Sequence, residues 1–222
     1  MKGSELINRL GYSKLTDENV YDEEGNFLPP AEVKAKLRSF EYMMSVRKLN
    51  KFSDFKHVIF KIDMKVQAQR DSMTKLMVQP ENPKLVEGQI FDVKPLNKYI
   101  SEEKLRGKAI LMFFWSSVYN ASGANVYSQL NEVFETYKNP DKLQVLVVNN
   151  LPPEQALKLL EKSPIVNTKL ILGAQEVNNA YQTKNDMLIL LTDQNHQILY
   201  SAKSSAEMTP RQLNNYLKAM FK

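Results

Sequence analysis

The 222-residue sequence contains no cysteine and only two histidines. Without cysteine the chain can form no disulfide, no thiolate nucleophile, no iron–sulfur ligand set and no thiolate zinc site. His57 and His196 are far apart in the sequence, so folding would have to bring them together to hold a transition metal. We therefore expect no metal site and no cofactor.

Long apolar runs are absent as well. A membrane-spanning helix needs roughly 18 or more apolar residues in a row, and no run approaches that length. The first residues lead into a polar, helix-like stretch rather than the apolar core of a signal peptide. We expect no transmembrane segment in this chain.

The positive net charge of +5 is not concentrated in one place, because lysine and arginine alternate with acidic residues throughout the chain. Nucleic-acid binders gather their basic residues on one stripe, often beside aromatic residues. The composition, 43% hydrophobic and 25% charged, is that of an ordinary folded domain. The sequence predicts a globular protein with no nucleic-acid partner.

The first 83 residues combine helix and strand signals. The run of Asp, Glu, Gly and Asn at residues 22–26 favours a turn, and it lacks the acidic alternation of a calcium loop. Pro29 and Pro30 suit a helix start, and the apolar spacing that follows predicts a helix face reaching Met44. Residues 58–66 alternate between apolar and polar, which predicts a half-buried strand.

A second short strand is expected at residues 74–78, where it could pair with the first. Gln79 to Pro83 is the best linker, because two prolines in five residues stop both a helix and a central strand. We therefore expect an α+β extension over residues 1–83 and a second domain over residues 84–222.

The second segment alternates between strand and helix signals. Residues 109–115 form a continuous apolar run, which is typical of a fully buried central strand. The remaining signals predict the order β-α-β-α-β-β-α, with a hairpin that turns at residues 193–196. This order implies an α/β fold with a mostly parallel sheet, an antiparallel edge, and helices on both faces.

Residues 105–117 have the sequence Leu-Arg-Gly-Lys-Ala-Ile-Leu-Met-Phe-Phe-Trp-Ser-Ser. This stretch resembles the approach to the active site in thioredoxin-like proteins of the TlpA-like and redoxin branch. The similarity continues through the later strands, helices and hairpin, and it covers about residues 85–222. The resemblance implies a thioredoxin-like mixed sheet with helices on both faces, preceded by the small N-terminal extension.

The chain departs from that family at the active site. Alignment on Trp115 puts Tyr119 and Ser122 at the two cysteine positions, with Asn120 between them. Met187 stands nearest to the family's cis-proline, and we expect a trans peptide there because a cis bond without proline costs several kcal/mol.

Neither hydroxyl can replace the missing thiols. Thiol–disulfide exchange needs a thiolate at a helix N-terminus and a second thiol to resolve the mixed disulfide. Ser122 would need a histidine base to act as a nucleophile, and His196 is expected in a turn at the opposite end of the sheet. We interpret Ser122 as a helix cap, and Tyr119 as a packing residue or as part of a binding surface.

The resemblance therefore implies a redox-inactive protein that binds a protein or peptide partner, or supports an assembly, through the remnant active-site groove. The residues that mark this groove are Trp115, Tyr119, Asn120, Ser122 and Met187. Two alternatives stay open. One is an enzyme of a non-thiol reaction type on the same scaffold. The other is a structural or oligomerising envelope protein, in which the strand at residues 58–66 extends the sheet or pairs with another chain. A periplasmic or cell-envelope location is implied by the resemblance alone.

Overall fold

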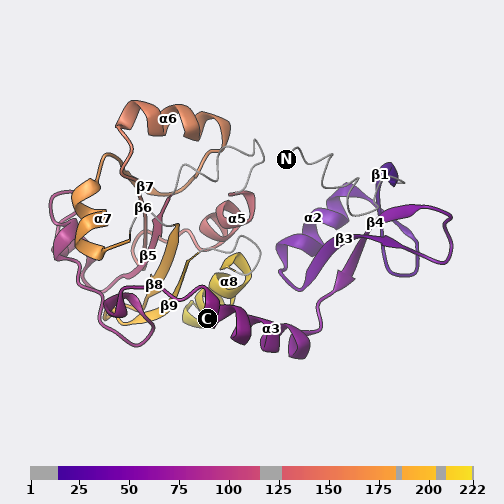
Figure 1. Ribbon diagram of the computed structural model, residues 1–222, viewed down its shortest axis with the longest axis horizontal. Coiled ribbons are helices and arrows are strands. Elements are labelled where there is room, and N and C mark those ends of the chain that lie inside the picture. The colour runs from indigo at the N-terminus through magenta and orange to yellow at the C-terminus, as the bar shows by residue number, and fades with distance from the viewer. Residues whose placement is uncertain (1–14, 116–126, 184–186, 204–208, 222) are drawn as a thin grey trace. The chain divides into compact units, whose positions relative to one another are not determined.

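The computed structural model describes residues 15–115, 127–183, 187–203 and 209–221 (Figure 1). Contacts within the chain divide it into two compact units, Met1–Gln69 and Arg70–Lys222. Among the described residues, no helix has the length and apolar character needed to cross a membrane. The two units are described in turn.

The first unit is a four-stranded sheet with one helix of its own. In chain order its elements are β1 (Leu15–Tyr21), β2 (Phe27–Leu28), α2 (Pro30–Arg38), β3 (Tyr42–Lys48) and β4 (Phe55–Lys61). The strand order is β2-β1-β4-β3, with β1 and β4 parallel and the other pairs antiparallel. Because β4 lies between β1 and β3, both of its edges are already paired. The alternative in which this strand extends the second sheet or pairs with another chain is therefore wrong.

The turn and the helix start in this unit are confirmed. The Asn26 backbone N–H donates to a carboxylate oxygen of Asp22 over 2.7 Å, which closes the turn before β2. Helix α2 begins at Pro30, as predicted, but it ends at Arg38 and does not reach Met44. The reason is Phe40, whose positive φ of 57° is a left-handed conformation that ends a helix. Met44 lies in β3.

The strand predicted at residues 58–66 is confirmed up to Lys61, where β4 ends. Its second part and the strand predicted at residues 74–78 are wrong, because the helix α3 (Met64–Met77) takes their place. One carboxylate oxygen of Asp63 accepts the backbone N–H groups of Lys65 and Val66, over 2.9 and 3.2 Å. This is the bonding of a helix N-cap, and it outweighs the alternation of apolar residues that continues past β4. Met64 and Val66 are 50% and 44% exposed, so the apolar alternation there marks no buried face.

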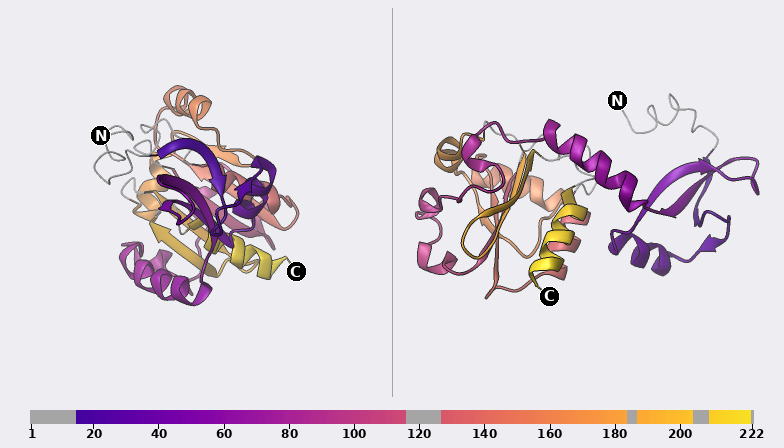
Figure 2. Two further views of the ribbon diagram at one scale, coloured as in Figure 1. Left: turned by 90° about the vertical axis from the view of Figure 1, so that its right-hand side faces the viewer. Right: turned by 90° about the horizontal axis from the view of Figure 1, so that it is seen from below.

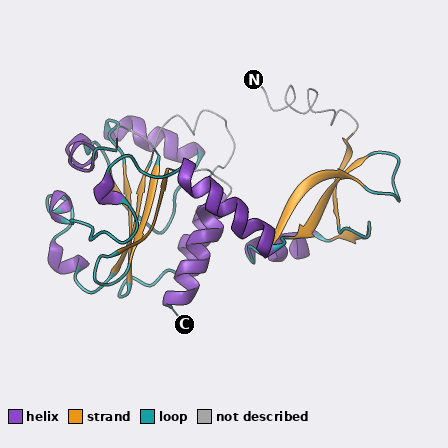
Figure 3. Ribbon diagram, turned by 60° about the horizontal axis from the view of Figure 1, so that its bottom comes forward, coloured by secondary structure: helices purple, strands orange, loops and turns teal. Residues whose placement is uncertain are grey.

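The second unit is built on a five-stranded sheet, shown in orange on the left of Figure 3. The segments before the sheet are the end of α3, two 3₁₀ turns, η1 (Pro83–Leu85) and η2 (Lys94–Leu96), and the short helix α4 (Glu102–Leu105). The sheet region then runs β5 (Ala109–Phe114), α5 (Ser128–Thr136), β6 (Leu143–Val148), α6 (Pro153–Lys162), β7 (Lys169–Ile171), α7 (Gln175–Tyr181), β8 (Leu188–Thr192), β9 (Ile198–Lys203) and α8 (Thr209–Met220).

The strand order in this sheet is β7-β6-β5-β8-β9. The strands β7, β6 and β5 are parallel, and β8 runs antiparallel to both β5 and β9. A central β5 flanked by parallel β6 and antiparallel β8, with a helix closing the chain, is the thioredoxin-like arrangement. The predicted fold class is therefore confirmed. The sequence pattern did not predict β7 and α7, which stand between α6 and β8.

Helices cover both faces of the sheet (Figure 2). All six residues of β5 are buried, as the continuous apolar run predicted. On one face, Ile110, Met112 and Phe114 pack with residues from η1, η2 and α7 in one apolar cluster. On the other face the helices α5 and α8 contact each other. Burial of this strand on both sides fixes its ends, and with them the position of the candidate site.

A surface network ties the segment after η2 to α7, and it provides a test of the fold in solution. The Oε1 atom of Glu176 accepts hydrogen bonds from Lys98 Nζ over 2.7 Å and Tyr99 Oη over 2.5 Å. These two bonds lower the pKa of the Glu176 carboxyl to about 2, and the bond from Lys98 has the larger effect. The stabilisation that comes with this shift is complete above the ordinary carboxyl pKa and is lost as the pH falls through about 2.

We therefore expect an NMR titration of the side-chain carboxyl carbons to show Glu176 with a pKa near 2. Lys98→Met removes the larger cause and should raise this pKa towards the ordinary range, while Tyr99→Phe should raise it by less. A carboxyl that titrates identically in all three proteins would contradict the network.

Candidate functional site

Three strand ends meet at one edge of the second sheet. Phe114 at the end of β5 lies opposite Leu188 at the start of β8, and Leu188 lies opposite Lys203 at the end of β9. Trp115 follows β5 and Met187 precedes β8, so both belong to this edge. The structure thus brings together the two predicted site residues that it describes. Tyr119, Asn120, Ser122 and the peptide bond from Asp186 to Met187 lie outside the described residues.

Trp115 is an anchor of the sheet edge rather than an exposed contact. Its side chain is 3% exposed, and its indole Nε1 donates a hydrogen bond to the hydroxyl of Tyr127. Its backbone N–H donates to the carbonyl of Val148 over 2.8 Å, which extends the pairing of β5 with β6 by one residue. The ring of Tyr127 also packs edge-on against Phe113, with centroids 5.7 Å apart. These contacts fix where the chain leaves β5.

Asn149 is a member of this edge that the sequence analysis missed. It is fully buried at the end of β6, and its Nδ2 donates to the carbonyl of Trp115 over 2.8 Å. Its Oδ1 accepts the backbone N–H of Leu151 over 2.6 Å, and its carbonyl accepts the N–H of Ala174 over 2.9 Å. A polar residue directly after a buried strand was the available signal. Asn149 holds the ends of β5 and β6 and the start of α7 in one arrangement.

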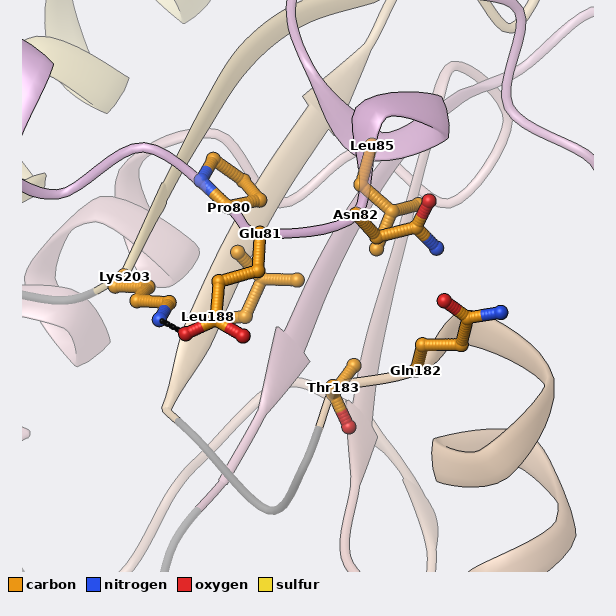
Figure 4. Close-up of a pocket in the computed structure, with 8 residues that line it drawn as sticks. All are labelled: Pro80, Glu81, Asn82, Leu85, Gln182, Thr183, Leu188 and Lys203. Atoms are coloured by element: carbon orange, nitrogen blue, oxygen red, sulfur yellow. Dashed lines mark hydrogen bonds and ion pairs between the residues drawn. The ribbon is translucent and has the colours of Figure 1, made fainter.

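Met187 is also buried, with 7% of its surface exposed. Beside it, a small pocket lies where β8 begins and β9 ends (Figure 4). Figure 4 shows the Lys203 ammonium reaching the Glu81 carboxylate, a distance of 2.8 Å. The pocket is lined by Pro80, Glu81, Asn82, Leu85, Gln182, Thr183, Leu188 and Lys203, and its volume is about 10 Å³. A volume of roughly 10–15 Å³ holds a single water molecule, so this pocket has no room for a substrate.

The two histidines take no part in this edge. The Nε2 atom of His196 lies 3.1 Å from the carbonyl oxygen of Leu105, which comes before β5 begins. His196 is therefore at the end of the sheet opposite Trp115, as predicted. His57 lies in β4, in the other unit. Within the described ranges, no group of three or more histidine or acidic side chains could hold a metal ion.

Comparison with protein-family models found no match, and comparison with curated proteins found none either. The structure is similar to a cysteine-to-serine variant of PrxQ from Xylella fastidiosa, with 12% identity and a TM-score of 0.49, over 62% of this chain and 98% of that chain. It is also similar to a putative thiol:disulfide interchange protein DsbE from Chlorobium tepidum, with 17% identity and a TM-score of 0.41, over 55% of this chain and 85% of that one. A thioredoxin-like protein from Parabacteroides distasonis gives 17% identity and a TM-score of 0.44, over 60% and 96%. The fold assignment stands on the strand order and register given above.

Proposed function

We propose that this chain is a redox-inactive thioredoxin-like protein that binds an extended peptide or protein partner at the sheet edge marked by Trp115 and Met187. One observation carries the proposal: the thioredoxin-like sheet is complete, while the whole sequence has no cysteine with which to carry out thiol chemistry. Thioredoxin-like proteins hold extended peptides beside the active site, and that groove does not itself require cysteines.

The bonding at the edge supports this role. Trp115 and Asn149 are buried and hydrogen-bonded, which costs conformational freedom and stabilises one geometry of the strand ends. Held in this way, Trp115 and Asn149 add little to the entropy cost of binding, because neither side chain has to be ordered when a partner arrives. With Trp115 and Met187 buried, we expect the direct contacts to come from Tyr119, Asn120 and Ser122.

The test is selection of phage-displayed twelve-residue peptides on the full chain, followed by titration of an enriched peptide by fluorescence anisotropy. Tyr119→Ala is expected to weaken binding by about tenfold or more, since a tyrosine in a binding surface is commonly a major contributor. Asn120→Ala and Ser122→Ala should weaken it by less.

The matched control is Gln194→Ala, which changes an exposed residue in the turn at the other end of the sheet. It should leave the affinity unchanged. A library with no enriched sequence, or a peptide that binds equally well to all of the variants, would refute the proposal.

A further inference from the structure

A larger cavity lies in the same unit, along the outer edge of β9. Its volume is about 270 Å³, near the lower end of the 300–1,000 Å³ that is typical of small-ligand sites. The lining comes from the second half of α3, from the segment after it and from β9: Ser72, Lys75, Leu76, Gln79, Pro80, Val86, Glu87 and Ser201. Nothing in the thioredoxin-like chemistry discussed above uses this cavity.

Two buried oxygen atoms in its wall have no hydrogen-bond partner among the residues that the structure describes. They are the hydroxyl of Ser201, whose residue is 4% exposed, and Oε1 of Glu87. The other carboxylate oxygen of Glu87, Oε2, accepts from Lys75 Nζ over 2.5 Å. Buried polar groups are nearly always hydrogen-bonded, so two such atoms in one cavity point to a group that binds there.

The backbone of β9 adds a third polar feature. Two backbone hydrogen bonds cover its outer edge. The N–H of Ile198 donates to the carbonyl of Gln89 over 2.8 Å, and the N–H of Lys203 donates to the carbonyl of Val78 over 2.6 Å. Ser201 lies between these two bonds. In an antiparallel pair, residues two apart turn their N–H and C=O groups the same way, so those of Ser201 also face outward, away from β8.

We infer that this cavity binds a small neutral amide with an aliphatic side chain, such as one residue of a peptide chain presents. The Glu87 oxygen is a carboxylate oxygen and can only accept, so the ligand must bring an N–H or O–H donor. The Ser201 hydroxyl can donate to a carbonyl oxygen. An amide offers both groups in one unit, and Leu76, Pro80 and Val86 provide apolar surface for the side chain.

The charge of the wall favours a neutral ligand. Lys75 and Glu87 already compensate each other across their 2.5 Å ion pair. A carboxylate placed beside the free oxygen of Glu87 would be repelled, and an additional charge of either sign would lose its hydration without a partner. The free acid of the same compound should therefore bind more weakly than the amide.

The experiment uses the full chain, labelled with ¹⁵N, and N-acetyl-L-leucinamide as the probe. Titration followed by two-dimensional ¹H–¹⁵N NMR should give saturable shifts at the amides of residues 72–79, 86–89 and 199–203. Ser201→Ala should weaken binding by about tenfold, the cost of removing a buried hydrogen bond. Val86→Phe, which fills the cavity, should abolish it.

The matched control is Thr183→Ala. Thr183 also has a buried hydroxyl without a hydrogen-bond partner in the described part of the chain, but it lines the other pocket. This variant should bind the probe as the unchanged protein does, and thermal melting should show that all three variants fold. N-acetyl-L-leucine and N-acetylglycinamide, which change the charge and remove the side chain, should both bind more weakly.

Three results would overturn the inference: no saturable shift up to the solubility limit of the probe, shifts at another site, or equal binding by the Ser201→Ala protein. A crystal soaked in the probe that holds only water in the cavity would overturn it as well. None of these results bears on the peptide site at Trp115, whose test depends on Tyr119 and not on Ser201.

Discussion

Replacing Trp115 by alanine is expected to lower the free energy of unfolding of the Arg70–Lys222 unit by about 3–5 kcal/mol. The indole is 3% exposed, and it packs where β5 ends. Truncation to alanine leaves a cavity at this edge and removes the hydrogen bond to the Tyr127 hydroxyl. The loss is a large fraction of the stability of a typical domain, which is about 5–15 kcal/mol.

Urea unfolding followed by far-ultraviolet circular dichroism measures this effect in the full chain. Trp115→Phe is the matched control, because it keeps an aromatic ring in place and removes the Nε1 donor; we expect it to cost about 1–2 kcal/mol. Since Trp115 is the only tryptophan, its fluorescence in the unchanged protein reports on this edge alone. A loss below about 1 kcal/mol for the alanine variant would mean that the indole is not the anchor that its contacts indicate.

The central strand could be predicted from the sequence because its environment is uniform. Every residue of β5 is buried, so the apolar run is continuous, and its limits agree with those of the strand to within one residue. The hairpin of β8 and β9 could also be predicted from the sequence, because turn-forming residues separate two apolar strands. Where both faces of a strand are buried, composition alone carries the signal.

The elements that were missed or misassigned lie where local bonding outweighs periodicity. At α3, the carboxylate of Asp63 caps a helix whose apolar residues are largely exposed, so alternation gave the wrong period. The strand β7 has three residues, of which Lys169 and Leu170 are exposed, and it carries no apolar pattern. Its pairing with β6 is what makes it a strand.

Some residues of the candidate site could be predicted from the sequence, and others are recognised only in the folded structure. The strand positions of Trp115 and Met187 followed from the resemblance, and the structure places both at one edge of the sheet. The sequence marks Asn149 only as a polar residue after a buried strand, and its role could not be predicted because that role depends on the carbonyl of Trp115, 34 residues earlier in the chain. The Ser201 hydroxyl, which lacks a hydrogen-bond partner among the described residues, likewise becomes visible only once β9 and the segment around Glu87 are folded together.

A pair of truncated chains should differ sharply in stability and thereby locate the start of the second domain. The sequence predicts a boundary after Pro83, and we expect a fragment that begins at Lys84 to be much less stable than one that begins at Arg70. The residues just before Lys84 are tied into the unit by side chains: Asp71 binds Arg211 through both carboxylate oxygens, each 2.6 Å from Nη2. Asn82 Nδ2 donates to the carbonyl of Tyr181 over 2.8 Å.

The fragment that begins at Arg70 keeps these contacts, so we expect its melting temperature to match a transition of the full chain. Arg211 is 7% exposed, and removing the partner of a buried charge costs about 3–5 kcal/mol. The shorter fragment also loses the bond from Lys203 N–H to the Val78 carbonyl, which covers the edge of β9. Differential scanning calorimetry of both fragments measures the difference in melting temperature. The Asp71→Asn variant of the full chain isolates the contribution of the Asp71–Arg211 ion pair to stability. If the two fragments melt at the same temperature, the second domain begins after Pro83, as the sequence predicts, and the contacts of Asp71 and Asn82 contribute little to stability.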